Sequence, residues 1–207
     1  MSFSDLLRQW FRNVLDFFGK SFTRMGLTPN AMTMIALIGS IIASILIATK
    51  NIQWGGILVL VMGPLDAVDG AMARIQDKVT PFGAFLDSIS DRYSELLILG
   101  GLLAYFIQLE YWQACLLVYF AAMGSVLVSY IRARGEALGF SAKAGILTRV
   151  ERYLVMAPSL IFNVPLIGLW IIAIFGNLTA IQRIWQVWIQ FKKSGKSDLY
   201  PTNMERK

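Results

Sequence analysis

Long apolar stretches separated by short polar connections dominate this chain of 207 residues. A helix needs about 20 predominantly apolar residues to cross a lipid bilayer. The first stretch follows Thr28-Pro29, a typical helix start with Thr as the cap and Pro as the first helical residue. The pattern predicts an all-α membrane protein with six transmembrane helices, at about residues 31–49, 53–74, 82–109, 112–133, 150–162 and 166–189.

The segment before these helices has a different pattern. Over residues 3–18, apolar and aromatic side chains recur every three to four positions, and charged side chains occupy the other side. This predicts an amphipathic helix that lies in the membrane interface. The alternative is that its apolar face packs against the helix bundle. We expect a single domain over residues 1–207, with the six-helix bundle at 31–189 and a polar tail at 192–207.

Composition and charge support a membrane location. The chain is 56% hydrophobic and only 15% charged, whereas a soluble domain has about 25% charged residues. Six crossings place both termini on one side, where almost all Lys and Arg between the helices also fall, and Lys50 is the exception. The positive-inside rule then predicts a multi-pass protein of the cell (plasma) membrane, with its termini and the candidate active site at residues 66–91 facing the cytoplasm. The net charge of +6 therefore indicates contact with anionic membrane lipids, not with nucleic acid.

Four aspartates, Asp66, Asp69, Asp87 and Asp91, interrupt two of the apolar segments. A carboxylate at membrane depth is costly, so it suggests a functional site. Asp66 and Asp69 share one helix face, and Asp87 and Asp91 share a face of the next helix after a short connection. Two adjacent antiparallel helices can therefore bring all four carboxylates together. Hard oxygen ligands of this kind suit Mg²⁺ or Mn²⁺, with room for two ions.

The surrounding residues also fit a phosphate-containing ligand. Gly70, Ala73 and Gly83 remove side-chain bulk beside the carboxylates, which allows close helix packing or leaves room for a ligand. Arg74 adds a planar positive group suited to a phosphate. The chain has no histidine, so any proton transfer must use Asp, Glu, Lys, Tyr or water.

The aspartate segment resembles the signature of a known enzyme family. The pattern Asp66-x2-Asp69-Gly70-x2-Ala73-Arg74-x8-Gly83-x3-Asp87-x3-Asp91 matches the CDP-alcohol phosphotransferase family without departure. The resemblance implies a metal-dependent transfer of a phosphatidyl group from a CDP-lipid to a hydroxyl, with release of CMP. It implies that Asp66, Asp69, Asp87 and Asp91 bind the metal ions and that Asp91 is the general base. It also implies a CDP-lipid site formed by Asp69, Gly70, Ala73, Arg74 and Gly83, with Pro29, Asn30 and Thr33.

Basic residues further along the chain point to the acceptor. Arg132, Arg149, Arg152 and Arg183 are candidate ligands of an acceptor phosphate, although positive-inside anchoring also explains several of them. Their segments resemble the phosphatidylinositol-phosphate synthase branch of the family and its archaeal ether-lipid relatives. That resemblance implies inositol 1-phosphate as acceptor, CDP-diacylglycerol or an ether-linked analogue as donor, and a homodimer. The alternatives are a phosphatidylglycerophosphate synthase that uses glycerol 3-phosphate, and a divalent-cation transporter.

Overall fold

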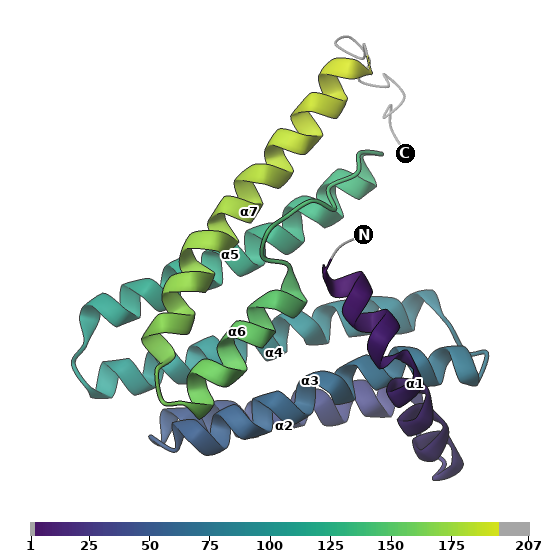
Figure 1. Cartoon of the computed structure of the whole chain (residues 1–207), viewed down its shortest axis with the longest axis horizontal. Helices are drawn as coiled ribbons and strands as arrows, with labels where there is room; N and C mark the ends of the chain where they lie inside the picture. The colour runs from purple at the N-terminus through teal and green to yellow at the C-terminus, as the bar shows by residue number, and fades with distance from the viewer. Residues whose placement is uncertain (1–2, 195–207) are drawn as a thin grey trace, which may run out of the picture.

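Seven α-helices make up the computed structural model, which describes residues 3–194 (Figure 1). Those residues contain no β-strand. The helices are α1 (Phe3–Arg24), α2 (Pro29–Ala48), α3 (Ile52–Ile75), α4 (Pro81–Gln108), α5 (Trp112–Ala137), α6 (Arg149–Ile161) and α7 (Pro165–Lys193).

The helix boundaries follow from local chemistry. Thr28 caps α2, because its side chain accepts a hydrogen bond from the backbone N–H of Ala31 at 3.3 Å, which confirms the predicted start. Thr80 caps α4 in the same way. At the far ends of α2, α4 and α6 the chain turns through Lys50, Glu110 and Asn163, which adopt the left-handed conformation common after a helix C-terminus.

The six predicted transmembrane helices coincide with α2–α7 to within a few residues. Four of them, α2, α3, α5 and α7, are long and apolar enough to cross a membrane. The other two differ: α4 carries four charged residues, Asp87, Asp91, Arg92 and Glu95, and α6 has only 13 residues. The structure thus supports a multi-pass membrane protein, and the count of six crossings stays a prediction.

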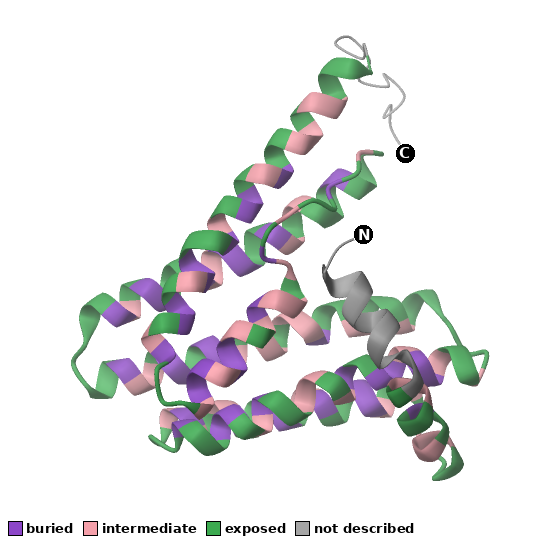
Figure 2. Cartoon of the chain, in the orientation of Figure 1, coloured by how far each residue is buried: buried purple, intermediate pink, exposed green. Residues whose placement is uncertain are grey.

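The helices form two groups with α6 between them. α2, α3 and α4 run alongside one another, whereas α5 and α7 pair and extend beyond them (Figure 1). α6 packs against both α3 and α7. The buried residues line the surfaces where these helices meet, and the outward faces are exposed (Figure 2). An apolar exterior of this kind suits contact with lipid.

α1 crosses α3 at a steep angle (Figure 1) and is longer than the predicted 3–18 segment. Leu15 and Phe22 pack into a small core with Met32, Val68 and Met72, so the described part of α1 contacts the bundle. Two aromatic side chains of the same helix, Phe17 and Phe18, face outward. The side chains of residues 1–13, and the tail beyond residue 194, lie outside the described residues, so the interfacial position stays a prediction.

Candidate functional site

Three of the four aspartates come together where α3 and α4 face each other. One carboxylate oxygen each from Asp66, Asp69 and Asp87 lies within 4.8 Å of the others. Asp66 and Asp69 are buried, at 9% and 6% exposure. A group of close carboxylate oxygens without nitrogen or sulfur ligands fits a hard divalent cation such as Mg²⁺ or Mn²⁺. The predicted convergence thus holds for three aspartates, and Asp91 occupies a different position.

Thr33 orients one member of this group. Its hydroxyl donates to the Oδ2 of Asp69 at 2.5 Å, so the start of α2 is joined directly to the aspartates of α3. The start of α2 also meets the start of α4, because a Cβ atom built on Gly83 would lie 3.5 Å from the side-chain oxygen of Asn30. The predicted nucleotide residues of these two helix starts are therefore neighbours.

The other predicted nucleotide residues lie on the last turns of α3. A Cβ atom built on Gly70 would meet only the guanidinium of Arg74, at 3.7 Å. Arg74 is exposed and Ala73 is half-buried. Gly70 therefore leaves open space beside a positive charge, as a phosphate ligand requires.

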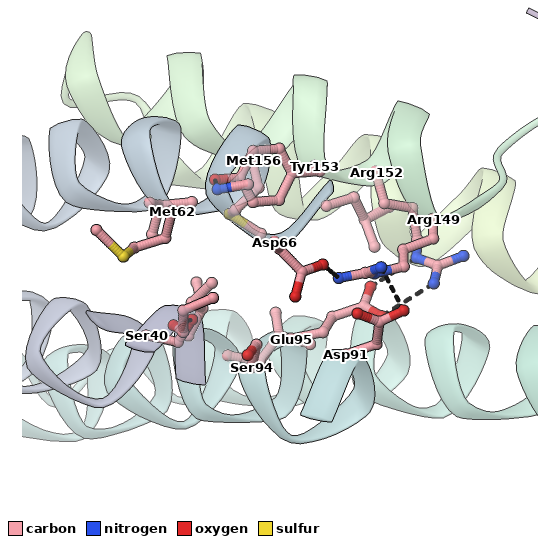
Figure 3. Close-up of a pocket in the computed structure, with 16 residues that line it drawn as sticks. Ser40, Met62, Asp66, Asp91, Ser94, Glu95, Arg149, Arg152, Tyr153 and Met156 are labelled. Carbon is pink, nitrogen blue, oxygen red and sulfur yellow. Dashed lines mark hydrogen bonds and ion pairs between the residues drawn. The ribbon is translucent and has the colours of Figure 1, made fainter. Parts of the chain in front are cut away.

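Asp91 pairs with an arginine from another helix. Arg149, at the start of α6, donates to the Oδ2 of Asp66 at 2.7 Å and forms an ion pair with the Oδ2 of Asp91 (Figure 3). The second carboxylate oxygen of Asp91 is buried and has no hydrogen-bond partner among the described residues. A buried polar atom left without a partner is uncommon and costly, so this oxygen is available to a ligand.

Arg152 is buried and held in an ion pair with Glu95. Its guanidinium donates to both carboxylate oxygens of Glu95, at 2.6 and 2.9 Å, and to the carbonyl oxygen of Leu147 at 3.2 Å. Only 2% of its side chain is exposed. The spacing Asp87, Asp91, Glu95 places all three acids on one face of α4, a signal that could have assigned Glu95 to the site from sequence.

The other two predicted acceptor arginines lie elsewhere. Arg132 forms an exposed ion pair with Glu136 at 3.0 Å. Arg183 is buried and donates to two backbone carbonyl oxygens, those of Ala144 at 2.9 Å and Val128 at 2.6 Å. Neither lines the cavity beside Asp66 and Asp91. The structure therefore brings Arg149 and Arg152 to the aspartates and places Arg132 and Arg183 apart.

A cavity of about 50 Å³ lies beside Asp66, Asp91, Arg149 and Arg152. Its polar end is formed by Asp66, Asp91, Glu95, Arg149, Arg152 and Tyr153 (Figure 3). Its other walls are mostly apolar and come from five helices, α2, α3, α4, α6 and α7. Tyr153 was missed by the sequence analysis. Its only sequence signal is its position four residues, about one helical turn, after Arg149.

Comparisons with known proteins identify relatives of this chain. The family model for CDP-alcohol phosphatidyltransferase matches residues 26–188. The chain is 36% identical to an archaetidylinositol phosphate synthase of Pyrococcus horikoshii, over 87% of this chain and 94% of that protein. It is 30% identical to a phosphatidylinositol phosphate synthase of Mycobacteroides abscessus, over 96% of this chain and 93% of that protein.

Solved structures show the same fold. A Mycobacterium tuberculosis phosphatidylinositol phosphate synthase with CDP-DAG bound superposes with a TM-score of 0.78 at 27% identity, covering 85% of this chain and 94% of the other. A second structure of that enzyme, in complex with manganese and citrate, also has a TM-score of 0.78 at 27% identity and covers 84% of this chain and 88% of the other. The match of the family model over most of the chain confirms the resemblance of the aspartate signature, and the chain belongs to the CDP-alcohol phosphatidyltransferase family.

Proposed function

We propose that this protein transfers the phosphatidyl group of a CDP-lipid to a hydroxyl of an inositol phosphate and releases CMP. One observation carries the proposal: a group of three carboxylates adjoins, through Asp66, a cavity that is also lined by a carboxylate with a free oxygen and by a guanidinium. The named relatives support the acceptor, because they are phosphatidylinositol phosphate and archaetidylinositol phosphate synthases. The donor is CDP-diacylglycerol or its ether-linked analogue.

Asp66, Asp69 and Asp87 would hold Mg²⁺ or Mn²⁺, with one or two ions bound. When bound, the metal would neutralise negative charge that develops on the pyrophosphate as the bond to CMP breaks. Thr33 restricts the carboxylate of Asp69 through its hydrogen bond, so the cluster is partly fixed in advance. Asp91 would join the metal ligands or stand next to them.

Asp91 is the proposed general base. The acceptor hydroxyl oxygen attacks the phosphorus atom attached to the lipid, a new P–O bond forms, and the P–O bond to CMP breaks. The hydroxyl proton passes to the carboxylate oxygen of Asp91 that lacks a partner. Its other oxygen is held by Arg149, which fixes the direction from which the base acts.

Arg149 is the guanidinium best placed for the acceptor phosphate. It lines the cavity and its side chain is 42% exposed, so a ligand can reach it. Arg152 also lines the cavity, but only 2% of its side chain is exposed, and Glu95 and a backbone carbonyl engage its nitrogens, which suits a supporting role. Arg132 and Arg183 remain weaker candidates for acceptor contacts, and kinetics of their variants decide the matter.

The nucleotide would lie across the helix starts and the last turns of α3. Pro29, Asn30 and Gly83 come from the starts of α2 and α4, and Gly70, Ala73 and Arg74 from α3. Small residues at these positions let a ligand approach the backbone. At this end of the helices the site would open to water, so CMP could leave.

The membrane arrangement is also a proposal. α2–α7 would form one domain of six crossings within residues 1–207, with α1 in the interface. The excess of basic residues near the site supports a position of that end in the cytoplasm and against anionic lipid of the cell membrane. A homodimer is proposed from the family resemblance alone.

The test is to identify the lipid product. Purified protein in detergent micelles receives CDP-diacylglycerol, Mn²⁺, and equal concentrations of inositol 1-phosphate and glycerol 3-phosphate, and the lipids are identified by mass spectrometry. We expect phosphatidylinositol phosphate and CMP. A phosphatidylglycerophosphate product would instead identify glycerol 3-phosphate as the acceptor. A parallel reaction with an ether-linked donor would identify the preferred lipid tails. EDTA should stop the reaction and excess Mg²⁺ or Mn²⁺ should restore it; full activity in chelator would contradict the metal site.

A further inference from the structure

Tyr153 of α6 packs on Gly63 of α3, three residues before Asp66, the first candidate metal ligand in the sequence. The backbone N–H of Gly63 donates to the phenol oxygen of Tyr153 at 2.8 Å. A Cβ atom built on Gly63 would lie 2.3 Å from the ring carbon that carries the hydroxyl and 2.6 Å from the phenol oxygen itself. Any residue other than glycine would therefore displace the ring, and Asp66 follows only three residues later.

A second contact joins α3 to α6 about one helical turn from this one. Gly63 and Asp66 are three residues apart on α3, and Tyr153 and Arg149 are four apart on α6, so each pair shares a helix face. Tyr153 meets Gly63, and Arg149 meets Asp66 at 2.7 Å. Two contacts about one turn apart fix both the rotation and the register of α3 against α6.

Pro64 makes the path of α3 between Gly63 and Asp66 sensitive to contacts from neighbouring helices. Proline has no backbone N–H, so a proline inside a helix removes one hydrogen bond and allows a bend. Pro64 lies inside α3, directly after Gly63 and two residues before Asp66. The direction of Asp66 therefore depends on what supports the helix at this point, and the phenol of Tyr153 is one side chain in contact there.

From these contacts we propose that Tyr153 is a positioning residue: by packing on Gly63 it sets where α3 presents Asp66 to the other metal-binding carboxylates. The inference rests on the proposed function, because it takes Asp66 as a metal ligand. Tyr153 acts on the ligand through the backbone. Hydrogen-bonded partners of metal ligands typically change metal affinity by about 10- to 100-fold when they are replaced, which sets the scale for a residue that supports a ligand through the backbone.

The test compares Mn²⁺ affinity of purified variants, with free Mn²⁺ measured by electron paramagnetic resonance. Gly63→Ala should weaken Mn²⁺ binding by about tenfold or more, because the new methyl group pushes the ring away. Tyr153→Phe keeps the ring volume and removes the hydrogen bond, so we expect a smaller loss in the same direction. The double variant Gly63→Ala/Tyr153→Leu should recover part of the affinity, since the smaller side chain makes room for the methyl group.

Gly56→Ala is the matched control. Gly56 lies seven residues before Gly63 on the same interface, and a Cβ atom there would lie 2.8 Å from the backbone nitrogen of Ile161. Both alanine variants should lower the melting temperature, but only Gly63→Ala should weaken Mn²⁺ binding. Equal Mn²⁺ affinity in Gly63→Ala and wild type, or equal losses in both alanine variants, would overturn the positioning role.

Two further measurements separate this inference from the proposed function. In the lipid assay, Tyr153→Phe should lower kcat and leave the acceptor KM within about twofold, because Tyr153 does not bind the acceptor. A rise in acceptor KM alone would make Tyr153 a substrate contact and overturn the inference. A wild-type protein that binds Mn²⁺ but makes no lipid product would contradict the proposed reaction and leave the affinity comparison valid. A wild type that binds no Mn²⁺ would overturn both.

Discussion

The aspartates and the four candidate acceptor arginines of this protein are positioned in different ways. The aspartates come from one pair of consecutive helices, where spacings of three and four residues align them. The arginines come from three helices, and each has a different partner: Glu136 for Arg132, two aspartates for Arg149, Glu95 for Arg152, and backbone carbonyls for Arg183. The comparison teaches that spacing assembles the metal cluster, whereas the partner decides what each arginine does.

The largest effect is expected on the aspartate side. Asp91→Asn removes the proposed base and should lower turnover by about 100-fold or more, while CDP-lipid binding remains. Turnover and CDP-lipid affinity are measured on the same preparation. Asp77→Asn is the control, because Asp77 is an exposed carboxylate in the connection between α3 and α4. Wild-type turnover in Asp91→Asn would show that Asp91 is not the general base.

The buried arginine should give the next largest effect, and on stability. Arg152→Met leaves Glu95 without its partner inside the bundle, which typically costs about 3–5 kcal/mol of unfolding free energy. The double variant Arg152→Met/Glu95→Leu should recover most of this loss, since no unpaired charge remains. Unfolding is followed by circular dichroism in detergent. A stable Arg152→Met protein with a raised acceptor KM would instead make Arg152 a substrate contact.

Variants of Arg149 and Arg183 distinguish acceptor binding from structural stabilisation. A hydrogen bond to a charged group contributes about 1.5–3 kcal/mol, so Arg149→Gln should raise the acceptor KM by roughly tenfold or more with little change in donor KM. Arg183→Ala should raise the acceptor KM less and lower the unfolding free energy, because two backbone carbonyls lose their donor. Equal effects of Arg183→Ala on the donor and acceptor KM values would argue against an acceptor phosphate at that position.

The smallest effect is expected at Arg132. Its ion pair with Glu136 is exposed on both sides, at 50% and 43%, and such pairs contribute about 0.2–1 kcal/mol. Arg132→Ala should therefore change stability within that range and leave the acceptor KM unchanged. Steady-state kinetics beside a thermal melt are sufficient. A large rise in acceptor KM would show that Arg132 contacts the acceptor and is not only a surface ion-pair residue.

Local patterns predicted much of the fold. The boundaries of α2–α7, the cap at Thr28 and the pairing of Asp66 with Asp69 all depend on residues close in sequence. The role of Thr33 was harder to predict. Its position near the site follows from the pattern around Pro29, but its hydrogen bond to Asp69 joins residues 36 apart.

The tertiary contacts of α6 could not be predicted in this way. Arg149 reaches Asp66 across 83 residues, and Tyr153 reaches Gly63 across 90. Periodicity shows which residues share a face of one helix, but it does not say which face of another helix they meet. The same limit applies to Arg152, whose partner Glu95 decides whether it binds substrate or supports the bundle.

The position of Asp66 and Asp69 along α3 has a consequence for how the two substrates arrive. Asp69 lies six residues and Asp66 nine residues before the end of α3 at Ile75, which at 1.5 Å per residue is about 9 and 14 Å along the helix axis. The polar headgroup region of a bilayer is about 5–7 Å thick on each side of the hydrocarbon core, so, with the end of α3 at the aqueous surface, these carboxylates would lie just below the headgroups. The donor can therefore diffuse in from the side without leaving the bilayer, and the water-soluble acceptor has only a short descent from the aqueous phase.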